Sequence, residues 1–194
     1  MRYLIILAHP NPESFSSSLI NALHDHLVNE GNEVKIRNLY AIGFNPVLSA
    51  DDFSSLADNK TPKDIEIEQE YVKWSDHIIF AFPVWWGGMP AMLKGYIDRV
   101  FSEGFAYEYV AEGVNGLLSP RKGSTICSTG AYSEEYKTVQ DAMKVISGEV
   151  IFDFVGIKPY KQLFYGGVPS VSDEVRKSYI QNALREFSDI LIVE

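Results

Sequence analysis

Apolar runs and helical periodicities alternate along the whole chain. Strand-like apolar runs occur at five places, namely residues 3–8, 33–39, 77–82, 123–129 and, more weakly, 160–165. The intervening segments repeat apolar residues at helical spacing, which predicts helices over 16–30, 64–74, 90–101, within 134–155 and from 172 onward. Strands that alternate with helices indicate an α/β fold in three layers, with one doubly wound parallel sheet covered on both faces.

One stretch breaks this alternation. Residues 40–63 show no clear periodicity and form a longer connection than is usual between a strand and a helix. We expect an irregular insertion here, which serves as a lid, as a subunit arm or simply as tolerated surface. With 194 residues and 46% hydrophobic content, the chain is predicted to form a single domain over 1–194.

The charge of the chain disfavours several classes of partner. A formal net charge of −9 makes nucleic acid and anionic membrane surfaces poor partners, because their phosphates repel such a surface. No apolar run approaches the roughly 18 residues that cross a bilayer, and the first strand begins within two residues of the start. We therefore expect a cytoplasmic protein that acts on small molecules, without membrane insertion.

Cysteine and histidine usage predicts no catalytic metal. Cys127 is the only cysteine and lies in a strand-like run, where a thiol packs as a small hydrophobe. The four histidines lack the spacing of a metal-binding motif. Neither residue type therefore provides a ligand cluster.

The first strand-like run is followed by a hydroxyl-rich turn that suits a phosphate. His9-Pro-Asn-Pro12 stops the strand, and serines stand at 14, 16, 17 and 18, where the next helix begins. A helix start offers unpaired N–H groups and the positive end of the helix dipole. No lysine or arginine occurs between Arg2 and Lys35, so backbone amides, serine hydroxyls and His9 would bind the anion. The alternative is that the serines only cap the helix.

Two tryptophans and two glycines follow the third strand-like run, in the segment 83–90. Glycines let a backbone approach a ligand closely, and Trp85 and Trp86 can form a flat apolar wall for an aromatic ring. The alternative places the tryptophans in the core. Adjacent side chains tend to point in different directions, however, so burial of both in one core is disfavoured.

Small and aromatic residues follow the fourth strand-like run and the third helix. Ser128-Thr-Gly-Ala131 leaves amides free for a ligand carbonyl or ring nitrogen, and the phenol of Tyr136 can donate a proton. The segment 104–109 carries an aromatic cluster that walls a substrate cleft, is buried in a dimer interface, or does both. With strand order 2-1-3-4-5, the loops after strands one, three and four meet at one edge of the sheet. A turn that binds phosphate, a flat apolar wall for an aromatic ring and free backbone amides together favour a flavin as the ligand.

Several segments resemble a known family. The matching segments are Leu7-Ala-His-Pro10, Ser14-Phe-Ser16, Asn38–Pro46, Phe80–Phe101, Gly104-Phe-Ala-Tyr107 and Ser128-Thr-Gly130. They resemble the NAD(P)H:quinone oxidoreductases of the flavodoxin-like fold, a family that includes DT-diaphorase and bacterial quinone reductases, some of them ancillary subunits of potassium-efflux systems. The matches run in order over about 1–136, and the stretch 83–101 is highly specific.

The resemblance implies a set of site residues. For the flavin pyrophosphate they are His9, Phe15, Ser16 and Ser18. For the isoalloxazine ring they are Pro83, Val84, Trp85, Trp86, Gly87, Ser128, Thr129, Gly130, Ala131 and Tyr136. Asp98 and Arg176 align with positions that touch adenine, which favours FAD over the alternative, FMN, although Arg176 is equally interpreted as a solvated charge. Tyr107 and Tyr109 fall where the family lines its quinone and nicotinamide cleft, usually across a homodimer interface.

The activity that the resemblance implies is a two-electron, ping-pong NAD(P)H:acceptor oxidoreductase. A nicotinamide hydride passes to flavin N5, and a quinone-like acceptor then takes two electrons in the same cleft. The Gly130 amide and the Tyr136 hydroxyl would stabilise negative charge near flavin N1 and O2. The chain departs from mammalian members at Ala142, where they have a proton-relay histidine, and from the family at Ala131, where glycine is usual. The alternatives are a flavin-binding ancillary subunit of a membrane transporter with little turnover, and a non-redox flavin-binding protein.

Overall fold

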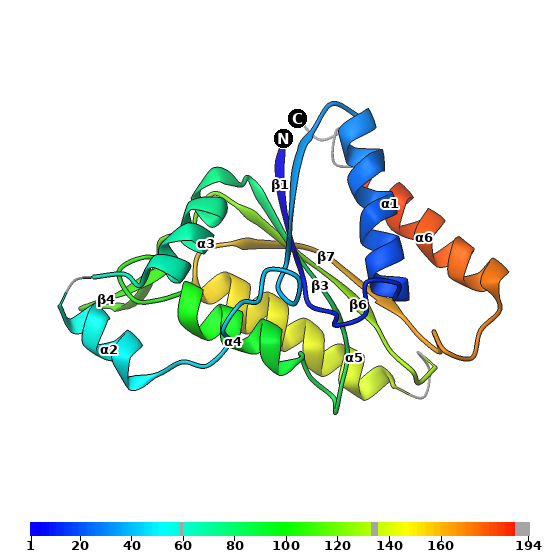
Figure 1. The fold of residues 1–194 in the computed structure, drawn as a ribbon. Coiled ribbons are helices and arrows are strands. Elements are labelled where there is room, and N and C mark those ends of the chain that lie inside the picture. The colour runs from blue at the N-terminus through cyan, green and yellow to red at the C-terminus, as the bar shows by residue number, and fades with distance from the viewer. Residues whose placement is uncertain (59, 133–135, 189–194) are drawn as a thin grey trace.

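The centre of the protein is the parallel sheet that the sequence predicts (Figure 1). The computed structural model describes residues 1–58, 60–132 and 136–188, so the end of the predicted domain lies outside the described residues. Within them the sheet has five strands in the order β2 (Glu33–Asn38), β1 (Arg2–Leu7), β3 (His77–Pro83), β6 (Lys122–Ser128) and β7 (Lys158–Tyr165). Each neighbouring pair is parallel, so the predicted order 2-1-3-4-5 is confirmed.

Helices cover both faces of the sheet (Figure 1). One face carries α1 (Phe15–Asn29) and α6 (Asp173–Ser188), and the other carries α3 (Lys63–Trp74), α4 (Ala91–Val100), α5 (Lys137–Lys144) and η1 (Val145–Phe152). Successive side chains of a strand point to opposite faces, so Leu4 and Ile6 enter one core while Ile5 and Leu7 enter the other. The runs 3–7 of β1 and 78–82 of β3, which are covered on both faces, are therefore apolar at every position and visible in the sequence.

The sequence pattern indicated an irregular segment over 40–63, but the segment is not irregular throughout. It contains a short helix, α2 (Ala50–Ala57). The Ser49 hydroxyl accepts a hydrogen bond from the Asp52 amide at 3.3 Å, and the Asp52 carboxylate accepts one from the Ser49 amide at 2.9 Å. This reciprocal cap stabilises the helix start, and it is made by polar groups that hydrophobic periodicity does not report. Residue 59, within the same segment, lies outside the described residues.

A buried arginine holds this segment against α4. The guanidinium of Arg99 binds the carboxylate of Asp52 at 2.9 Å and that of Asp64 at 2.6 Å, and it donates to the Asn45 carbonyl at 2.8 Å. The Arg99 and Asp52 side chains are 5% and 9% exposed. A pair so far removed from water contributes to stability only while both partners are present.

The predicted helix within 134–155 changes its type part-way. It is α-helical to Lys144 and π-helical over Val145–Phe152, and its first two predicted positions lie outside the described residues. A Cβ added to Gly148 would stand 2.4 Å from Nε2 of Gln162 on β7. That amide also donates to the Lys144 carbonyl at 3.2 Å. Gly148 therefore admits a strand side chain close to the helix rather than breaking the helix.

An antiparallel hairpin, β4 (Tyr107–Val110) and β5 (Gly113–Gly116), lies outside the main sheet and was not predicted. Most of its residues are exposed, so its strands show no alternation of buried and polar positions. Hydrophobic pattern identifies a strand only where one of its faces is buried.

Candidate active site

A hollow of about 180 Å³ lies at the edge of the sheet where the parallel strands end. Its lining consists of His9, Phe15, Ser16, Pro83, Val84, Trp85, Ser128, Thr129, Gly130, Val168 and Pro169. The loops after β1, β3 and β6 thus meet here as predicted, and they bring Ser16, Trp85 and Gly130 together. In open α/β sheets this edge is where ligands bind, because neighbouring connections diverge to opposite faces there.

His9 is held as a neutral hydrogen-bond donor. The amide of Asn11 donates to His9 Nδ1 at 3.0 Å, which leaves the ring proton of the neutral imidazole on Nε2. Partial burial lowers the pKa of His9 below its usual value, so the neutral form prevails at neutral pH. An Nε2–H group in the lining of the hollow suits an anionic oxygen.

The four serines at the start of α1 have different roles. Ser14 is the N-cap, and its hydroxyl accepts from the Ser17 amide at 3.2 Å. Ser17 is buried and its own hydroxyl donates to the Asn11 carbonyl, so Ser14 and Ser17 serve the turn itself. Ser16 lines the hollow, and Ser18 is exposed. The capping interpretation therefore holds for Ser14 and Ser17, whereas the Ser16 hydroxyl bonds to that of Ser128 and the Ser18 hydroxyl is exposed.

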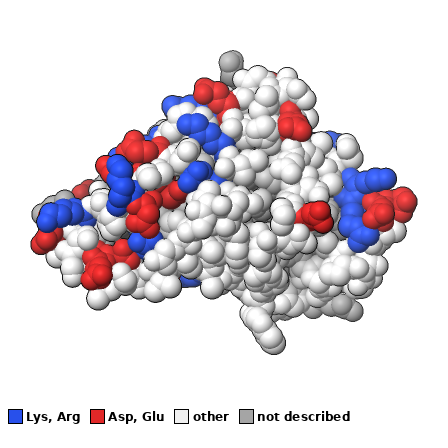
Figure 2. Space-filling view, viewed as in Figure 1, with Lys and Arg blue, Asp and Glu red and all other residues white. Residues whose placement is uncertain are grey.

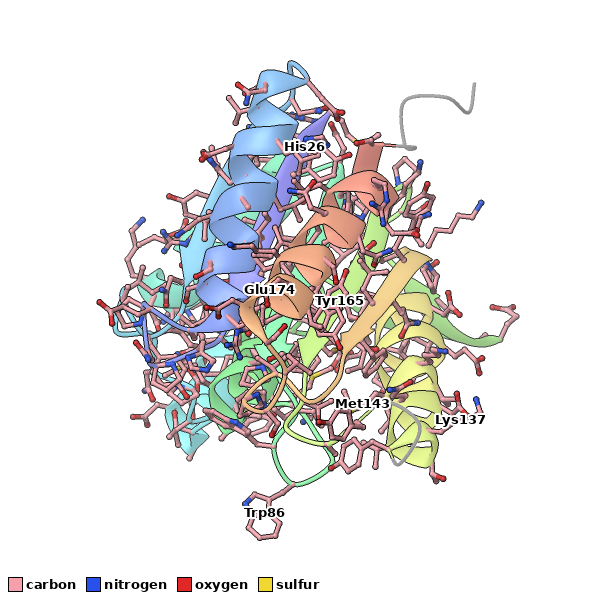
Figure 3. All side chains as sticks on the ribbon, turned by 90° about the vertical axis from the view of Figure 1, so that its right-hand side faces the viewer. His26, Trp86, Lys137, Met143, Tyr165 and Glu174 are labelled. Atoms are coloured by element: carbon pink, nitrogen blue, oxygen red, sulfur yellow. The ribbon has the colours of Figure 1, made fainter. Side chains whose placement is uncertain are left out.

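The two tryptophans occupy a tight turn and point in different directions. Trp85 and Gly88 exchange two backbone hydrogen bonds of 3.0 Å around Trp86 and Gly87, whose φ angles are 51° and 74°. These positive angles correspond to the type I′ turn of a two-residue hairpin. Trp85 is 42% exposed and lines the hollow, whereas Trp86 is 104% exposed and projects away from the body of the molecule (Figure 3). Neither indole belongs to the core.

The space that a side chain at position 130 would occupy is open. A Cβ added there would meet only Pro169 Cγ, at 4.0 Å, among the described residues. The neighbouring backbone is fixed, because the Thr129 amide donates to the Tyr165 carbonyl at 3.0 Å and the Ala131 amide donates to the Thr129 hydroxyl at 3.2 Å. Gly130 is thus a rigid position with room in front of it.

A fourth loop lines the hollow and was missed in the sequence. Val168 and Pro169, which follow β7, form part of its lining. The Gly167 amide donates to the Ala131 carbonyl at 2.7 Å, which joins this loop to the loop after β6. The signal that could have found it is the sequence Gly166-Gly-Val-Pro169 directly after the weakest predicted strand.

Tyr136 lies beside the core rather than in the described lining of the hollow. It precedes the first residue of α5 and is half-buried against the core that α3, α4 and α5 cover. Residues 133–135, between Tyr136 and the loop after β6, lie outside the described residues. The contact of Tyr136 with a cofactor therefore stays a prediction. Ala142, the position of the family's histidine, is exposed on α5.

Tyr107 and Tyr109 do not line this hollow within one protomer. The centroids of their rings lie 5.7 Å apart in an edge-to-face arrangement, and the centroid of the Tyr107 ring lies 5.0 Å from that of Phe154. Tyr107 lines a separate hollow of about 370 Å³, together with Asp98 and residues of η1. Within one protomer these tyrosines therefore do not form a cleft at the edge where the strands end, and their place in a substrate cleft stays a prediction.

Asp98 and Arg176, the predicted adenine contacts, lie on opposite faces of the sheet, on α4 and α6 (Figure 1). Asp98 accepts a 2.5 Å hydrogen bond from Lys94. Arg176 donates to Asp173 at 2.7 Å and to the Val168 carbonyl at 2.8 Å. One protomer does not bring the two residues to the same adenine.

Two larger hollows, of about 510 and 640 Å³, lie beside α2 rather than at the strand ends. Both include Leu56 and the residues 102–104. They lack the convergent loops of the smaller hollow. Size alone therefore does not identify the site.

The remaining chemical candidates are structural. Burial raises the pKa of the Cys127 thiol, so it packs as a small hydrophobe, as predicted. Among the described residues, no group of three or more His, Cys, Asp or Glu is placed to hold a metal ion. In the same part of the chain, no helix has the length and apolar character to cross a membrane.

The fold and the position of the hollow define a class of protein that binds its ligand at the ends of parallel strands. The family described as having the flavodoxin-like fold matches residues 1–191, and the chain belongs to it. The predicted fold class is thereby confirmed.

Its relatives bear oxidoreductase names. An uncharacterized NAD(P)H oxidoreductase of Haemophilus influenzae is 32% identical, with 96% of this chain and 94% of that protein covered. NAD(P)H dehydrogenase (quinone) 1 of Cavia porcellus is 35% identical over 85% of this chain and 68% of that protein. The structure of an NAD(P)H:quinone oxidoreductase from Methanothermobacter marburgensis has a TM-score of 0.89 at 26% identity, covering 100% of this chain and 98% of that one. The resemblance stated from the sequence is confirmed.

Proposed function

We propose that the protein is a flavin-dependent NAD(P)H:quinone oxidoreductase. The observation that carries the proposal is the convergence of His9, Ser16, Trp85 and Gly130 on one hollow at the strand ends. The names of its relatives support the same reaction class. When bound, a flavin supplies the two-electron chemistry by which a nicotinamide donor reduces a quinone.

The first turn of α1 supports binding of the flavin phosphate. The amides of Phe15 and Ser16 lie in that turn, where no carbonyl precedes them within the helix. His9 Nε2–H and the exposed hydroxyl of Ser18 add two neutral donors. Since no Lys or Arg lies between Arg2 and Lys35, we expect a modest dependence of flavin affinity on salt.

The second part of the hollow supports binding of the flavin ring. Trp85 provides an apolar wall, and Gly130 lines the hollow without a side chain that would fill it. We propose that the Gly130 amide and the Tyr136 hydroxyl donate to the ring edge that becomes negative on reduction. The ring and the first phosphate are common to FAD and FMN, and these residues serve either cofactor. The predicted contacts of the FAD adenine are Asp98 and Arg176. Each of them already has a hydrogen-bond partner within its own protomer.

We further propose that the active form is a homodimer. In the face that Figure 2 shows, charged side chains gather toward the two sides, and the middle carries few of them. Exposed apolar side chains also gather where the hairpin meets η1 and the residues after it, since Tyr107 packs against both Tyr109 and Phe154. The exposed members are Val145, Ile146, Val150, Phe154, Tyr109 and Val114. Contiguous apolar surface of this kind marks a protein–protein interface. A partner bound there would place its Tyr107 and Tyr109 beside the cofactor hollow.

The test combines spectroscopy with turnover. We expect the purified protein to bind flavin, to oxidise NADH or NADPH over many turnovers only when a soluble quinone is present, and to sediment as a dimer. The flavin released on denaturation, identified by chromatography, distinguishes FAD from FMN. Protein that holds flavin but does not oxidise either nicotinamide would instead support the ancillary or non-redox alternatives, and protein that takes up no flavin would contradict all of them.

A further inference from the structure

The loop Gly166–Pro169, between β7 and α6, forms one wall of the hollow. Val168 and Pro169 contribute to its lining, and Pro169 Cγ is the atom nearest to the space in front of Gly130. Because Gly130, Val168 and Pro169 line the same hollow, a ring bound in it would lie beside Pro169. The position of this wall decides how closely the ring is enclosed.

Two sets of contacts hold this loop. Its amides bind the loop after β6: Gly167 donates to the Ala131 carbonyl at 2.7 Å, and Val168 donates to the Thr129 carbonyl at 3.1 Å. Its carbonyls bind α6, because side chains of that helix donate to Gly166 and to Val168. The wall is thus fixed between the cofactor edge of the sheet on one side and α6 on the other.

Arg176 makes the charged contact with this loop. Its Nη1 donates to the Val168 carbonyl at 2.8 Å, while Nε and Nη2 donate to Asp173 Oδ1 at 3.2 and 2.7 Å. Asp173 thereby orients the guanidinium, and each of the three nitrogens has a partner within the protomer. A hydrogen bond from a charged donor is stronger than one between neutral groups. The second anchor is neutral: the Tyr179 hydroxyl donates to the Gly166 carbonyl at 3.1 Å.

We propose that Arg176 is a positioning residue of the cofactor site, which fixes the Val168–Pro169 wall through the Val168 carbonyl rather than by contact with adenine. The inference rests on the proposed function in that the ligand of the hollow is a flavin. This role differs from the adenine contact that the family resemblance implies for Arg176. The two roles differ in a measurable way, because the wall faces the part that FMN and FAD share, whereas only FAD has an adenine.

The test is flavin affinity measured separately for FMN and FAD, by quenching of flavin fluorescence on titration of the apoprotein. We expect Arg176→Ala to weaken both affinities by the same factor, about tenfold for the loss of one charge-assisted hydrogen bond. Arg185→Ala is the matched control, because Arg185 is exposed near the end of the same helix and its loss changes the charge equally. We expect it to leave both affinities unchanged.

Two further variants keep the test decisive if Arg176→Ala folds poorly. Tyr179→Phe removes only the hydroxyl bound to Gly166, and we expect a smaller loss that is again equal for the two flavins. Arg176→Lys keeps one donor for the Val168 carbonyl, so it should restore part of the affinity for both. It should also restore the absorption shift that accompanies flavin binding, a signature that follows the surroundings of the ring.

Three results would overturn the inference. A loss confined to FAD would show that Arg176 contacts the adenine, and unchanged affinities in Arg176→Ala and Tyr179→Phe would show that the wall does not depend on α6. Wild-type protein that binds neither flavin would remove the proposed function and this inference together. If the wild-type protein binds flavin and Arg176→Ala binds it with the same affinity, the inference is wrong while the proposed function stands.

Discussion

The hydroxyl of Ser16, in the first turn of α1, lies 3.1 Å from the hydroxyl of Ser128 at the end of β6. Both side chains are nearly buried, at 7% and 8% exposure, and both line the hollow. The contact joins the turn proposed for the phosphate to the loop proposed for the ring. It therefore fixes the spacing between the two halves of the site.

The first prediction concerns this contact. Ser16→Ala removes one hydroxyl and leaves the backbone amides in place, so we expect flavin affinity to fall about tenfold with a change in unfolding free energy of about 1 kcal/mol or less. Fluorescence titration and urea denaturation measure the two quantities. Ser178→Ala, an exposed hydroxyl on α6, is the control and should change neither. Equal affinities of wild type and Ser16→Ala would exclude Ser16 from the site.

The space in front of Gly130 gives the second prediction. Its φ angle is not positive, and an added Cβ meets only Pro169 Cγ at 4.0 Å, so Gly130→Val should fold with an unchanged melting temperature. The same side chain fills the place proposed for the ring edge, and we expect flavin affinity to fall by at least tenfold. Gly95→Ala provides the opposite case, because its Cβ would stand about 2 Å from the Pro46 carbonyl oxygen and should destabilise the fold. Normal flavin binding by Gly130→Val would place the ring elsewhere.

The third prediction separates catalysis from binding at Tyr136. Tyr136→Phe keeps the half-buried ring and removes the hydroxyl that we propose as a donor to the reduced flavin. We expect kcat with a quinone acceptor to fall about tenfold or more while flavin affinity changes little, since the lost hydrogen bond matters mainly in the transition state. Steady-state kinetics of flavin-saturated protein measures the effect. An unchanged kcat would remove Tyr136 from the mechanism.

The fourth prediction concerns the clamp on the segment 40–63. Arg99→Met leaves the carboxylate of Asp52 buried without its partner, and we expect a loss of about 3 kcal/mol in unfolding free energy. Arg2→Met is the control: it removes the same charge from a pair whose side chains are 43% and 42% exposed, and should cost less than about 1 kcal/mol. Urea denaturation measures both variants. Equal losses would mean that burial does not set the strength of the Arg99 pair.

The fifth prediction is a pH dependence centred on His77. Its side chain is fully buried, and burial lowers its pKa from 6.5 to about 3. Between these values the unfolded chain binds a proton that the folded protein does not, so stability rises with pH from about 3 to about 6.5 and is lost as the pH falls.

His77→Gln removes that titration and retains a group that can bond to the Ser124 hydroxyl, now 2.9 Å from His77 Nε2. We expect the slope of unfolding free energy between pH 4 and 6 to decrease by about 1.4 kcal/mol per pH unit. Urea denaturation at three pH values in that range measures it. His24→Gln is the control, because the side chain of His24 is 36% exposed and lies outside the core. Parallel pH profiles of His77→Gln and wild type would contradict the assignment.

By itself the sequence determined the layered α/β fold and the three loops that carry His9, Trp85 and Gly130, whereas the strand order came with the flavodoxin-like resemblance. The fold and the loops follow from local chemistry: strands covered on both faces carry long apolar runs, and loops that bind a ligand carry glycine, serine and aromatic residues. Because the carboxyl ends of parallel strands share an edge, the meeting of the three loops followed from the strand order alone.

Tertiary structure alone decided the features that depend on contacts between distant residues. The helix α2 is held by Arg99 from another element, the π-helical turns accommodate Gln162 from β7, and the wall of Val168 and Pro169 is fixed by Arg176. The placement of Asp98 and Arg176 on opposite faces of the sheet likewise depends on which side each helix packs. Hydrophobic periodicity reports which residues are buried, whereas these polar contacts form only after the chain has folded, so no local pattern in the sequence encodes them.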